Sequence, residues 1–197
     1  MKKSLLLLTI MALCMTFAPE SLWAAVTGDA PVKGNEPLLI TNAGQGPGGK
    51  MGRLLVRRSK AVKTMKYNAE PTIEDIKNGG YKTILVVVGS SAKGLGASGI
   101  TIDDEVARLV KVMEGCKEAG VQVIVAHIEG KARRGKAGSA NERSIDAVAP
   151  YAQAFIVKSD SDLDGRFTKL AEANNAPLTV IDETLDFMTV VKEMYSK

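Results

Sequence analysis

Three stretches that follow apolar runs combine glycine with basic side chains, a combination typical of anion-binding sites. Glycine lets backbone N–H groups approach a ligand, and the N-terminus of a helix favours negative charge. A guanidinium group binds a carboxylate or phosphate through two parallel hydrogen bonds. The stretches are residues 41–50 (TNAGQGPGGK), 89–99 (GSSAKGLGASG) and 127–138 (HIEGKARRGKAG). They predict a site for a small carboxylate or phosphate, lined by Thr41, Gln45, Ser90, Ser91, Lys93, His127, Arg133 and Arg134.

An exposed, solvated basic turn is the alternative interpretation of Arg133 and Arg134, because such turns are common on protein surfaces. A fourth stretch, residues 158–165 (KSDSDLDG), is acidic and offers carboxylates that could pair with these arginines. Such pairing would lower the net attraction of the site for an anion.

Hydrolysis by a serine nucleophile is a second hypothesis. Ser90 and Ser91 end an apolar run where a hydrolase would carry its nucleophile, and His127, the only histidine, ends the next run. An aspartate between residues 160 and 164 would orient the histidine, although the order of the three residues proves nothing. Lys93 stands where a nucleophile elbow has its second glycine. The residues therefore favour a hydrogen-bonded histidine and turn-capping serines over a triad.

Two nucleotide-binding motifs are nearly present. Residues 44–50 have the spacing of a phosphate-binding loop, but Met51 replaces the Ser or Thr that would hold magnesium. Residues 94–99 match the dinucleotide pattern but begin five residues after Gly89, where the preceding strand has already ended. One histidine, one thiol and scattered carboxylates form no recognisable metal set. We therefore expect no cofactor and no metal.

Apolar periodicity predicts strands and helices in strict alternation. The runs predict strands at 37–41, 63–67, 83–88, 121–126, 154–157 and 178–181. The intervening segments predict helices at 50–62, 72–76, 103–119, 141–149, 163–174 and 184–195. This order predicts an α/β fold: a single three-layer domain with a mostly parallel, flavodoxin-like (Rossmann-like) sheet. Ligands bind such sheets outside the carboxyl ends of the strands, where the glycine-rich stretches fall.

The N-terminus has the layout of a secretory signal: basic residues at 2–3, an apolar run over 4–17 and small residues at 24–25. This run is short for a membrane span of about 20 residues. We expect a signal peptide over 1–24, a flexible lead-in over 25–36 and the α/β domain over 37–197. The protein would then be exported to the periplasm or the extracellular space, without a stable membrane span. A retained N-terminal anchor is the alternative.

The composition of the chain limits the classes of partner that we expect for the domain. Without the two lysines and Glu20 of the signal, the net charge falls from +4 to +3 (4 − 2 + 1), a mild excess. Aromatic residues make up 5% of the chain, too few to favour base stacking, so we expect no nucleic-acid partner. Cys116 is the only thiol beyond residue 24, which leaves no internal disulfide. Its apolar, helical neighbourhood predicts a buried structural cysteine.

The chain also resembles a bacterial family of exported domains of unknown function, number 6305, over nearly all of the expected mature chain. The resemblance rests on residues 37–45, 88–100, 103–105, 108, 127–130, 133–135, 164–167 and 177–180. It implies an exported domain of this build and brings no established activity, substrate or catalytic residue. Residues 46–50 depart from the family pattern, which has a less glycine-rich turn, and this argues against a special role for Lys50.

Three functional hypotheses follow from the sequence. The first is an exported domain that binds a small anion at the carboxyl ends of the strands, as an accessory that presents it to a transporter component. The second is a hydrolase that uses Ser90 or Ser91 with His127. The third is a protein-interaction domain whose basic loops meet an acidic partner.

Overall fold

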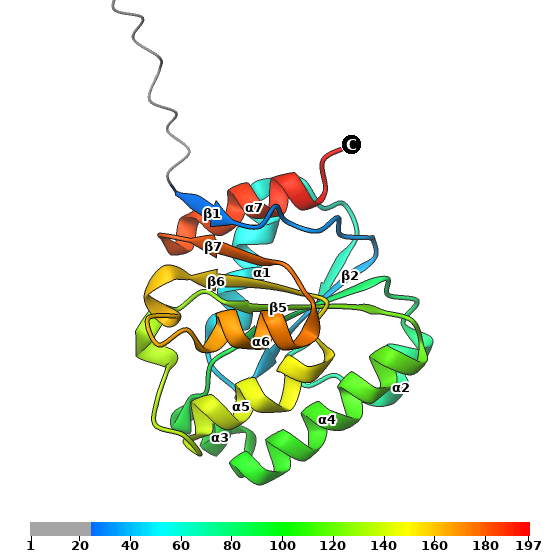
Figure 1. Cartoon of the computed structure of the whole chain (residues 1–197). Coiled ribbons are helices and arrows are strands. Elements are labelled where there is room, and N and C mark those ends of the chain that lie inside the picture. Colours follow the sequence, from blue (N-terminus) through cyan, green and yellow to red (C-terminus); the bar gives the residue numbers. More distant parts are fainter. Residues whose placement is uncertain (1–24) are drawn as a thin grey trace, which may run out of the picture.

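The uninterrupted apolar run Thr83–Val88 forms strand β4, all of whose residues are buried, inside a seven-stranded sheet. The computed structural model describes residues 25–197, so the signal expected over 1–24 lies outside the described residues. The sheet has the strand order β1-β7-β6-β5-β4-β2-β3 (Figure 1). The other strands are β1 (Val26–Gly28), β2 (Leu38–Ala43), β3 (Met65–Tyr67), β5 (Gln122–His127), β6 (Ala154–Lys158) and β7 (Leu178–Ile181).

Strands β2 to β7 are mutually parallel, and β1 joins β7 in antiparallel fashion. Without β1, the order along the sheet is that of a flavodoxin-like fold extended by one strand, which confirms the predicted fold class. The strand order reverses between β2 and β4, so the loops after these two strands meet at the carboxyl edge of the sheet. We call this side of the domain the carboxyl edge.

Helices cover both faces of the sheet (Figure 1). The core on one face contains side chains of α2, α4, α5 and α6, and the core on the other contains side chains of α1 and α7. The helices are α1 (Gly48–Ser59), α2 (Ile73–Asn78), α3 (Ala92–Ser98), α4 (Ile102–Glu118), α5 (Ala140–Val148), α6 (Arg166–Asn174) and α7 (Phe187–Met194). None of the helices within residues 25–197 has the length and apolarity that a membrane crossing requires.

The lead-in expected to be flexible instead contains strand β1, which pairs Val26 with Ile181 and Gly28 with Thr179. Three residues are too few to show a strand periodicity. The strand forms because the outer edge of β7 offers backbone groups that need partners.

Helix α3 lies within the stretch 89–99, which the sequence presents as a loop. Glycine is less favourable in a helix than alanine by about 1 kcal/mol per residue. Because the segment contains Gly94 and Gly96, its sequence does not predict this helix. Gly94 is required by packing, because a Cβ there would lie 1.9 Å from the carbonyl oxygen of Gln45. The helix begins where the Oγ of Ser91 accepts a hydrogen bond from the Gly94 amide.

Cys116 is a buried free thiol in the core of α4, as predicted. Burial raises its pKa to about 12. The thiol is therefore protonated at neutral pH and contributes packing rather than nucleophilic chemistry.

Candidate functional site

At the strand-order reversal, the loops after β2 and β4 pack directly against each other. Gln45 forms an isolated bridge with Ser90, and the Ser91 amide donates to the carbonyl of Gly44 at 2.9 Å. Gly44 has a φ of 98°, and a Cβ there would lie 2.7 Å from the Cα of Ser90. Glycine at this position therefore permits the close approach of the two loops.

A buried carboxylate from α4 holds the first of these loops. Glu105 is fully buried, and its Oε1 accepts a hydrogen bond from the Gly44 amide at 2.9 Å. Its Oε2 accepts one from Gln45 Nε2 at 3.1 Å. Arg108 donates to both oxygens, at 2.8 and 2.9 Å, and neutralises the charge. The spacing of Glu105 and Arg108, three residues apart on the amphipathic helix α4, is the sequence signal that could have found this pair.

Arg133 also forms an ion pair with a carboxylate. Its Nε donates to Glu129 Oε1 at 3.0 Å, and a second guanidinium nitrogen donates to the carbonyl of Ser90 at 3.0 Å. The other Glu129 oxygen is buried without a hydrogen-bond partner, and a Cβ on Gly48 would lie 2.6 Å from it. This carboxylate therefore lies beside the first turn of α1, where the helix dipole favours negative charge.

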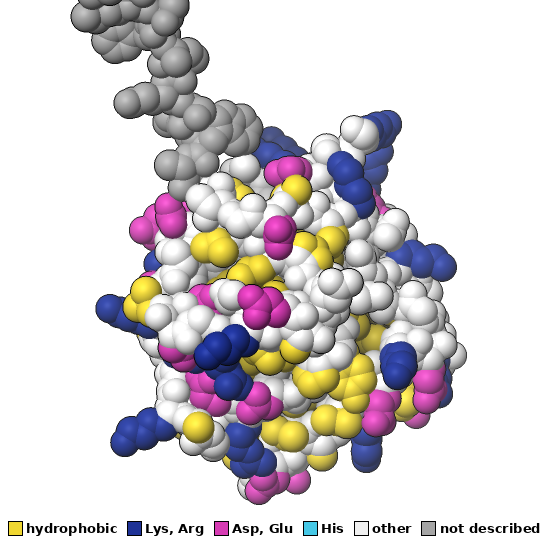
Figure 2. All heavy atoms as spheres, in the orientation of Figure 1, with side chains coloured by type: hydrophobic (Ala, Val, Ile, Leu, Met, Phe, Trp, Pro, Cys, Tyr) yellow, Lys and Arg dark blue, Asp and Glu magenta, His cyan; other side chains and the backbone are white. Residues whose placement is uncertain are grey.

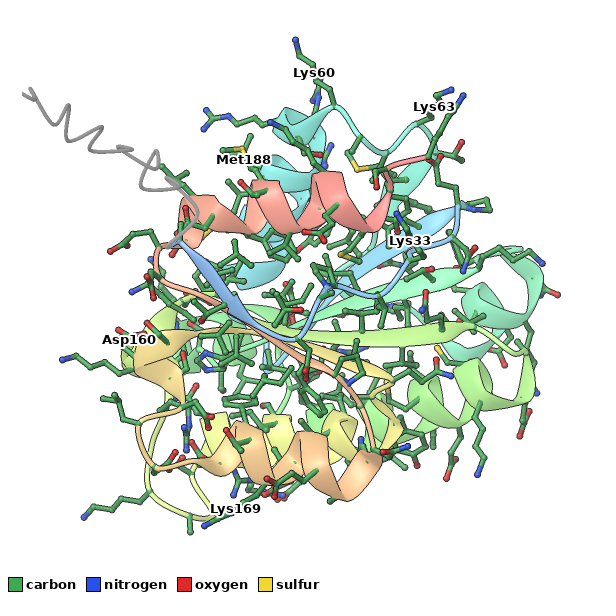
Figure 3. All side chains as sticks on the ribbon, turned by 45° about the horizontal axis from the view of Figure 1, so that its top comes forward. Lys33, Lys60, Lys63, Asp160, Lys169 and Met188 are labelled. Carbon is green, nitrogen blue, oxygen red and sulfur yellow. The ribbon has the colours of Figure 1, made fainter. Side chains whose placement is uncertain are left out.

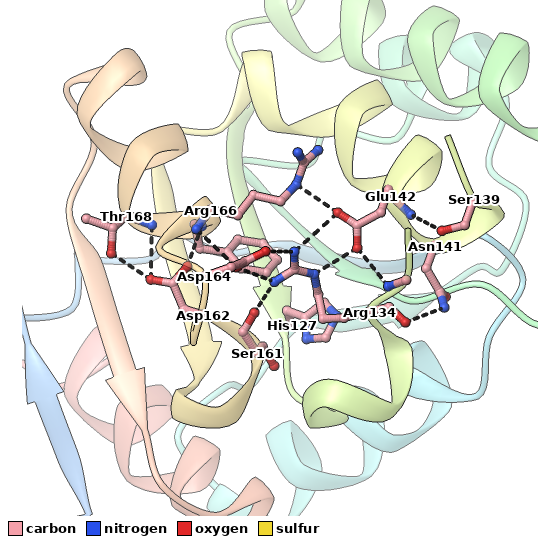
Figure 4. Close-up of polar contacts among 12 residues, drawn as sticks. His127, Arg134, Ser139, Asn141, Glu142, Ser161, Asp162, Asp164, Arg166 and Thr168 are labelled. Atoms are coloured by element: carbon pink, nitrogen blue, oxygen red, sulfur yellow. Dashed lines mark hydrogen bonds and ion pairs between the residues drawn. The ribbon is translucent and has the colours of Figure 1, made fainter. Parts of the chain in front are cut away.

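Arg134 is at the centre of the densest polar network, shown in Figure 4. It donates to the two oxygens of Glu142 at 2.8 and 3.3 Å, to the two oxygens of Asp164 at 2.8 and 3.1 Å, and to the carbonyl of Ser161. Glu142, which is 3% exposed, also forms an ion pair with Arg166 at 2.9 Å. The pairing of the basic turn with the acidic stretch, the alternative drawn from the sequence, is present in Arg134 and Asp164.

These contacts raise the pKa of Arg134 and lower the pKa of Asp164. Burial lowers the pKa of Arg134, but the hydrogen bonds and charges of Asp164 and Glu142 outweigh this effect and leave it raised. The hydrogen bond from Arg134 lowers the pKa of Asp164 to about 2. Both groups are therefore charged at neutral pH, and each neutralises the other.

His127 is fully buried, and its ring lies 5.2 Å from the ring of Phe167. Nε2 lies 3.2 Å from the carbonyl oxygen of Arg133, which can only accept, so Nε2 carries the proton. Burial is the main cause that lowers the pKa of His127. The imidazole is therefore neutral at physiological pH, and its Nδ1 is buried without a partner.

The serines are not arranged as a nucleophile and base with this histidine. The Oγ of Ser91 accepts from the Gly94 amide at 3.1 Å, and the Oγ of Ser90 is buried without a partner. Within residues 25–197, no hydrogen bond joins either serine to His127. His127 is hydrogen-bonded and Ser91 caps a helix, whereas the hydroxyl of Ser90 caps neither a turn nor a helix.

The eight residues predicted to line a site differ in their surroundings. Gln45, Ser90 and Arg133 are joined through the contacts described above. Thr41 is fully buried inside the sheet, and its hydroxyl donates to the carbonyl of Ala69 at 3.3 Å. Lys93 is exposed on α3. The residues that sequence reasoning missed here are the buried carboxylates that hold the arginines: Glu105, Glu129 and Glu142.

A second region of the domain carries positive charge on exposed side chains. No acidic residue occurs between Glu36 and Glu70, whereas seven basic residues do. All seven side chains are exposed, on α1, on β3 or between them. We call this region the basic face; its cations are Lys50, Arg53, Arg57, Arg58, Lys60, Lys63 and Lys66.

The basic face contains a hollow of about 520 Å³ between α1 and β3, lined by Arg53, Arg57, Val62, Lys63, Met65, Lys66 and Tyr67. The guanidinium of Arg53 lies over the ring of Tyr67, 5.9 Å from its centroid. The Tyr67 hydroxyl accepts a hydrogen bond from Asn42 Nδ2 at 3.2 Å, which fixes the ring at the carboxyl end of β3.

The cations of the basic face form no ion pair with any residue of the described range, 25–197. Glu36 contacts the segment beside the hollow, where its Oε2 accepts hydrogen bonds from the amides of Lys63 and Thr64 at 3.1 and 2.6 Å. That contact involves backbone groups and leaves the Lys63 ammonium unpaired. Residues 25–197 also contain no cluster of three or more side chains suited to binding a metal ion.

Comparison with known proteins yields one family match: residues 35–195 match the model of a domain of unknown function, DUF6305. No curated protein matches the chain. Solved structures with a similar arrangement include the esterase EstA from Pseudoalteromonas sp. (12% identity, 80% of this chain and 93% of that chain, TM-score 0.35). Others are a putative acylhydrolase from Bacteroides fragilis (8%, 74% and 69%, 0.35) and a mutant of the esterase AlinE4 (15%, 77% and 76%, 0.32). Likeness at this level says nothing of this chain's activity.

Proposed function

The chain belongs to the DUF6305 family, whose description assigns no activity, and we propose from its charge distribution that it binds a small anionic ligand, a carboxylate or phosphate. The ligand site that we propose is the hollow between α1 and β3. The carrying observation is the set of four unpaired cations around this hollow: Arg53, Arg57, Lys63 and Lys66. We also propose that the domain is exported and that it presents its ligand to a transporter component.

The charge of the chain is concentrated on the basic face. Residues 37–69 carry +7, and residues 1–24 carry +1, so the remaining residues sum to −4 (4 − 7 − 1). Figure 2 shows a face away from this region, on which basic and acidic side chains are interspersed. A cluster of one sign raises the local concentration of a ligand of the opposite sign and speeds its association.

The cost of binding also favours the hollow over the carboxyl edge. An anion that binds Arg133 or Arg134 competes with Glu129 or Glu142, and a glutamate displaced in this way would lose the partner of its charge in a nearly buried place. An anion in the hollow displaces only water and counterions, since its cations have no partners. Exposed contacts of this kind contribute up to about 1 kcal/mol each, so several must act together.

The hydrolase hypothesis gains no support from the site geometry, because its histidine is buried and one of its serines caps α3. The protein-interaction hypothesis shares its chemistry with the proposal, since an acidic partner would meet the same cations. Binding of a small anion to the purified protein distinguishes these two possibilities.

The test is thermal unfolding of the purified protein with pyrophosphate or citrate at low ionic strength. A ligand at one hundred times its dissociation constant stabilises the protein by about 2.7 kcal/mol. For a domain of this size, this raises the Tm by about 5–10 °C. We expect the shift to be lost in Arg53→Gln/Arg57→Gln and kept in Lys111→Gln/Lys117→Gln, which removes two exposed charges from α4.

Two results would overturn the proposal. One is the absence of a shift with either anion in a protein that unfolds cooperatively. The other is an equal shift in wild type and in Arg53→Gln/Arg57→Gln. If the shift were instead lost in Arg133→Gln, the ligand would bind at the carboxyl edge as the sequence predicts.

A further inference from the structure

We propose that the ligand of the basic face is a linear, base-free polyanion with repeated phosphate groups, which lies along α1 and enters the hollow. This inference rests on the proposed function, because it concerns the same face, and it specifies the ligand as a chain.

The first argument is the extent of the face relative to the hollow. Four of the seven cations line the hollow, whereas Lys50, Arg58 and Lys60 lie outside it. In Figure 3, Lys60 and Lys63 extend from the segment after α1 into solvent, away from the body of the domain. A single small anion would neutralise the cations of the hollow and leave the others unmatched. A chain with repeated charges can contact all of them.

The second argument is the composition of α1 on its solvent side. Its exposed side chains are four cations and one leucine, and its first turn has no acidic residue. The helix rises 1.5 Å per residue, so Lys50, Arg53 and Arg57 follow one another at intervals of about 5 Å along the axis. These three cations therefore form a row along the helix, beside which a chain with repeated charges can lie.

A lipid bilayer fits the face less well than a polymer chain. Insertion into a bilayer requires an apolar face of substantial area, and Leu54, 45% exposed, is the only large apolar side chain exposed on α1. The surface between α1 and β3 is also hollowed. A flat bilayer surface does not follow a hollow of this kind, whereas a chain can lie in it.

A nucleic acid fits less well because the face offers no free aromatic surface for its bases. Tyr67 is the only aromatic residue between residues 37 and 69, and the Arg53 guanidinium lies over its ring. Base stacking on aromatic side chains contributes about 1–3 kcal/mol per base to single-strand binding. Without it, the bases would add bulk and no affinity, so a base-free chain is favoured.

The test compares long-chain inorganic polyphosphate with pyrophosphate, each titrated into the purified protein by calorimetry at several salt concentrations. We expect polyphosphate to bind at least tenfold more tightly. The slope of log K against log salt is about −0.7 per neutralised contact on a single strand. It should therefore be about −5 for polyphosphate on seven cations and no steeper than about −3 for pyrophosphate on four.

A pair of charge-matched variants on the same helix locates the effect. Lys50→Gln/Arg58→Gln removes cations outside the hollow, and we expect it to weaken polyphosphate about tenfold while leaving pyrophosphate unchanged. Arg53→Gln/Arg57→Gln removes cations of the hollow and should weaken both ligands. Circular dichroism and the Tm of each variant check that the fold is intact.

The outcomes separate this inference from the proposed function. Equal affinity for the two phosphates, with no effect of Lys50→Gln/Arg58→Gln, would overturn the polymer and leave the small-anion function standing. Binding of neither phosphate would overturn the polymer, and the absence of citrate binding as well would overturn the proposed function. Binding to phosphatidylglycerol vesicles without binding to polyphosphate would establish a bilayer instead. Tighter binding of a single-stranded oligonucleotide of equal charge would overturn the base-free ligand.

Discussion

The carboxyl edge and the basic face both contain several positive side chains, but the arginines of the first are paired with carboxylates and, in the described part of the chain, the cations of the second are not. At the carboxyl edge each of three arginines contacts a buried or nearly buried glutamate, in the pairs Arg108–Glu105, Arg133–Glu129 and Arg134–Glu142. On the basic face the cations are exposed and have no carboxylate partner among residues 25–197. Pairing, rather than the number of basic residues, therefore decides which region can attract an anion.

The charges of the two regions also contribute differently to the stability of the fold. Buried charges are retained at the carboxyl edge only because each has a partner, so the loss of one partner leaves the other uncompensated. Exposed charges on the basic face are solvated and repel one another weakly. Substitutions should therefore change stability strongly in the first region and hardly at all in the second.

The largest effect should come from Glu105→Ala. The change removes a fully buried carboxylate that accepts hydrogen bonds from Arg108, the Gly44 amide and the Gln45 side chain. We expect a loss of about 3–5 kcal/mol in the free energy of unfolding, measured by urea denaturation. Lys111→Ala, at an exposed position of the same helix, is the control. A loss below about 1 kcal/mol would show that the carboxyl edge does not depend on its ion pairs.

The next effect concerns His127 and pH. Burial lowers its pKa in the folded protein, so the unfolded chain takes up a proton first as the pH falls through its ordinary value of about 6.5. Stability is therefore fully present above that value and decreases below it, by at most about 1.4 kcal/mol per pH unit. We expect this decrease to begin below about pH 6.5 in wild type and to be absent in His127→Gln.

The same residue offers a direct measurement, because the chain has a single histidine. Its ring protons give one titration curve by NMR, and we expect the midpoint of this curve to lie below the ordinary value of about 6.5. A curve centred at or above 6.5 would mean an accessible imidazole and would revive the hydrolase hypothesis.

A smaller effect should follow from Asp164→Asn. Hydrogen bonding to Arg134 lowers the pKa of Asp164 to about 2, so its contribution is present above its ordinary pKa and is lost as the pH falls toward 2. The carboxylate is mostly exposed, and Arg134 keeps Glu142, so we expect a loss of no more than about 1 kcal/mol at pH 7. At pH 2, wild type and variant should have similar stability. A difference that persists at pH 2 would point to packing rather than charge.

The smallest effect on stability should come from Arg53→Gln/Arg57→Gln. These side chains have no ion-pair partners in the described part of the chain, so we expect a change within about 0.5 kcal/mol at moderate salt. At low salt the variant should be slightly more stable than wild type, because repulsion among the cations is less screened there. Denaturant curves at 10 and 150 mM salt measure this. A loss above about 1 kcal/mol would mean that the basic face is structural.

The sheet was predictable from sequence because its central strands contain continuous apolar runs. Thr83–Val88 has no polar interruption after its first residue, and the runs at 38–40 and 154–157 are nearly as clear. Helix α3 was not predictable, because Gly94 and Gly96 oppose a helix that is fixed by contact with Gln45. Strand β1 depends on an edge 150 residues away along the chain.

The residues of the candidate sites were also predictable only in part. Arg133 and Arg134 stand out in the sequence, but their partners Glu129 and Glu142 are ordinary residues until the fold brings them together. The basic face was missed because the predicted helix over 50–62 was interpreted from its apolar positions. The absence of acidic residues from 37 to 69 was the signal that could have found it.

The pairing of β1 with β7 also determines the order in which the sheet can be completed during synthesis. Val26–Gly28 leaves the ribosome early, yet its partner strand ends at Ile181, near the C-terminus (Figure 1). The first strand of the described chain therefore pairs with the sheet only after the last strand has been made. Long-range pairings of this kind slow folding, because the intervening chain must be ordered first. A nascent chain that stops before β7 would leave β1 without a partner, so complete translation is a condition for closing this edge of the sheet.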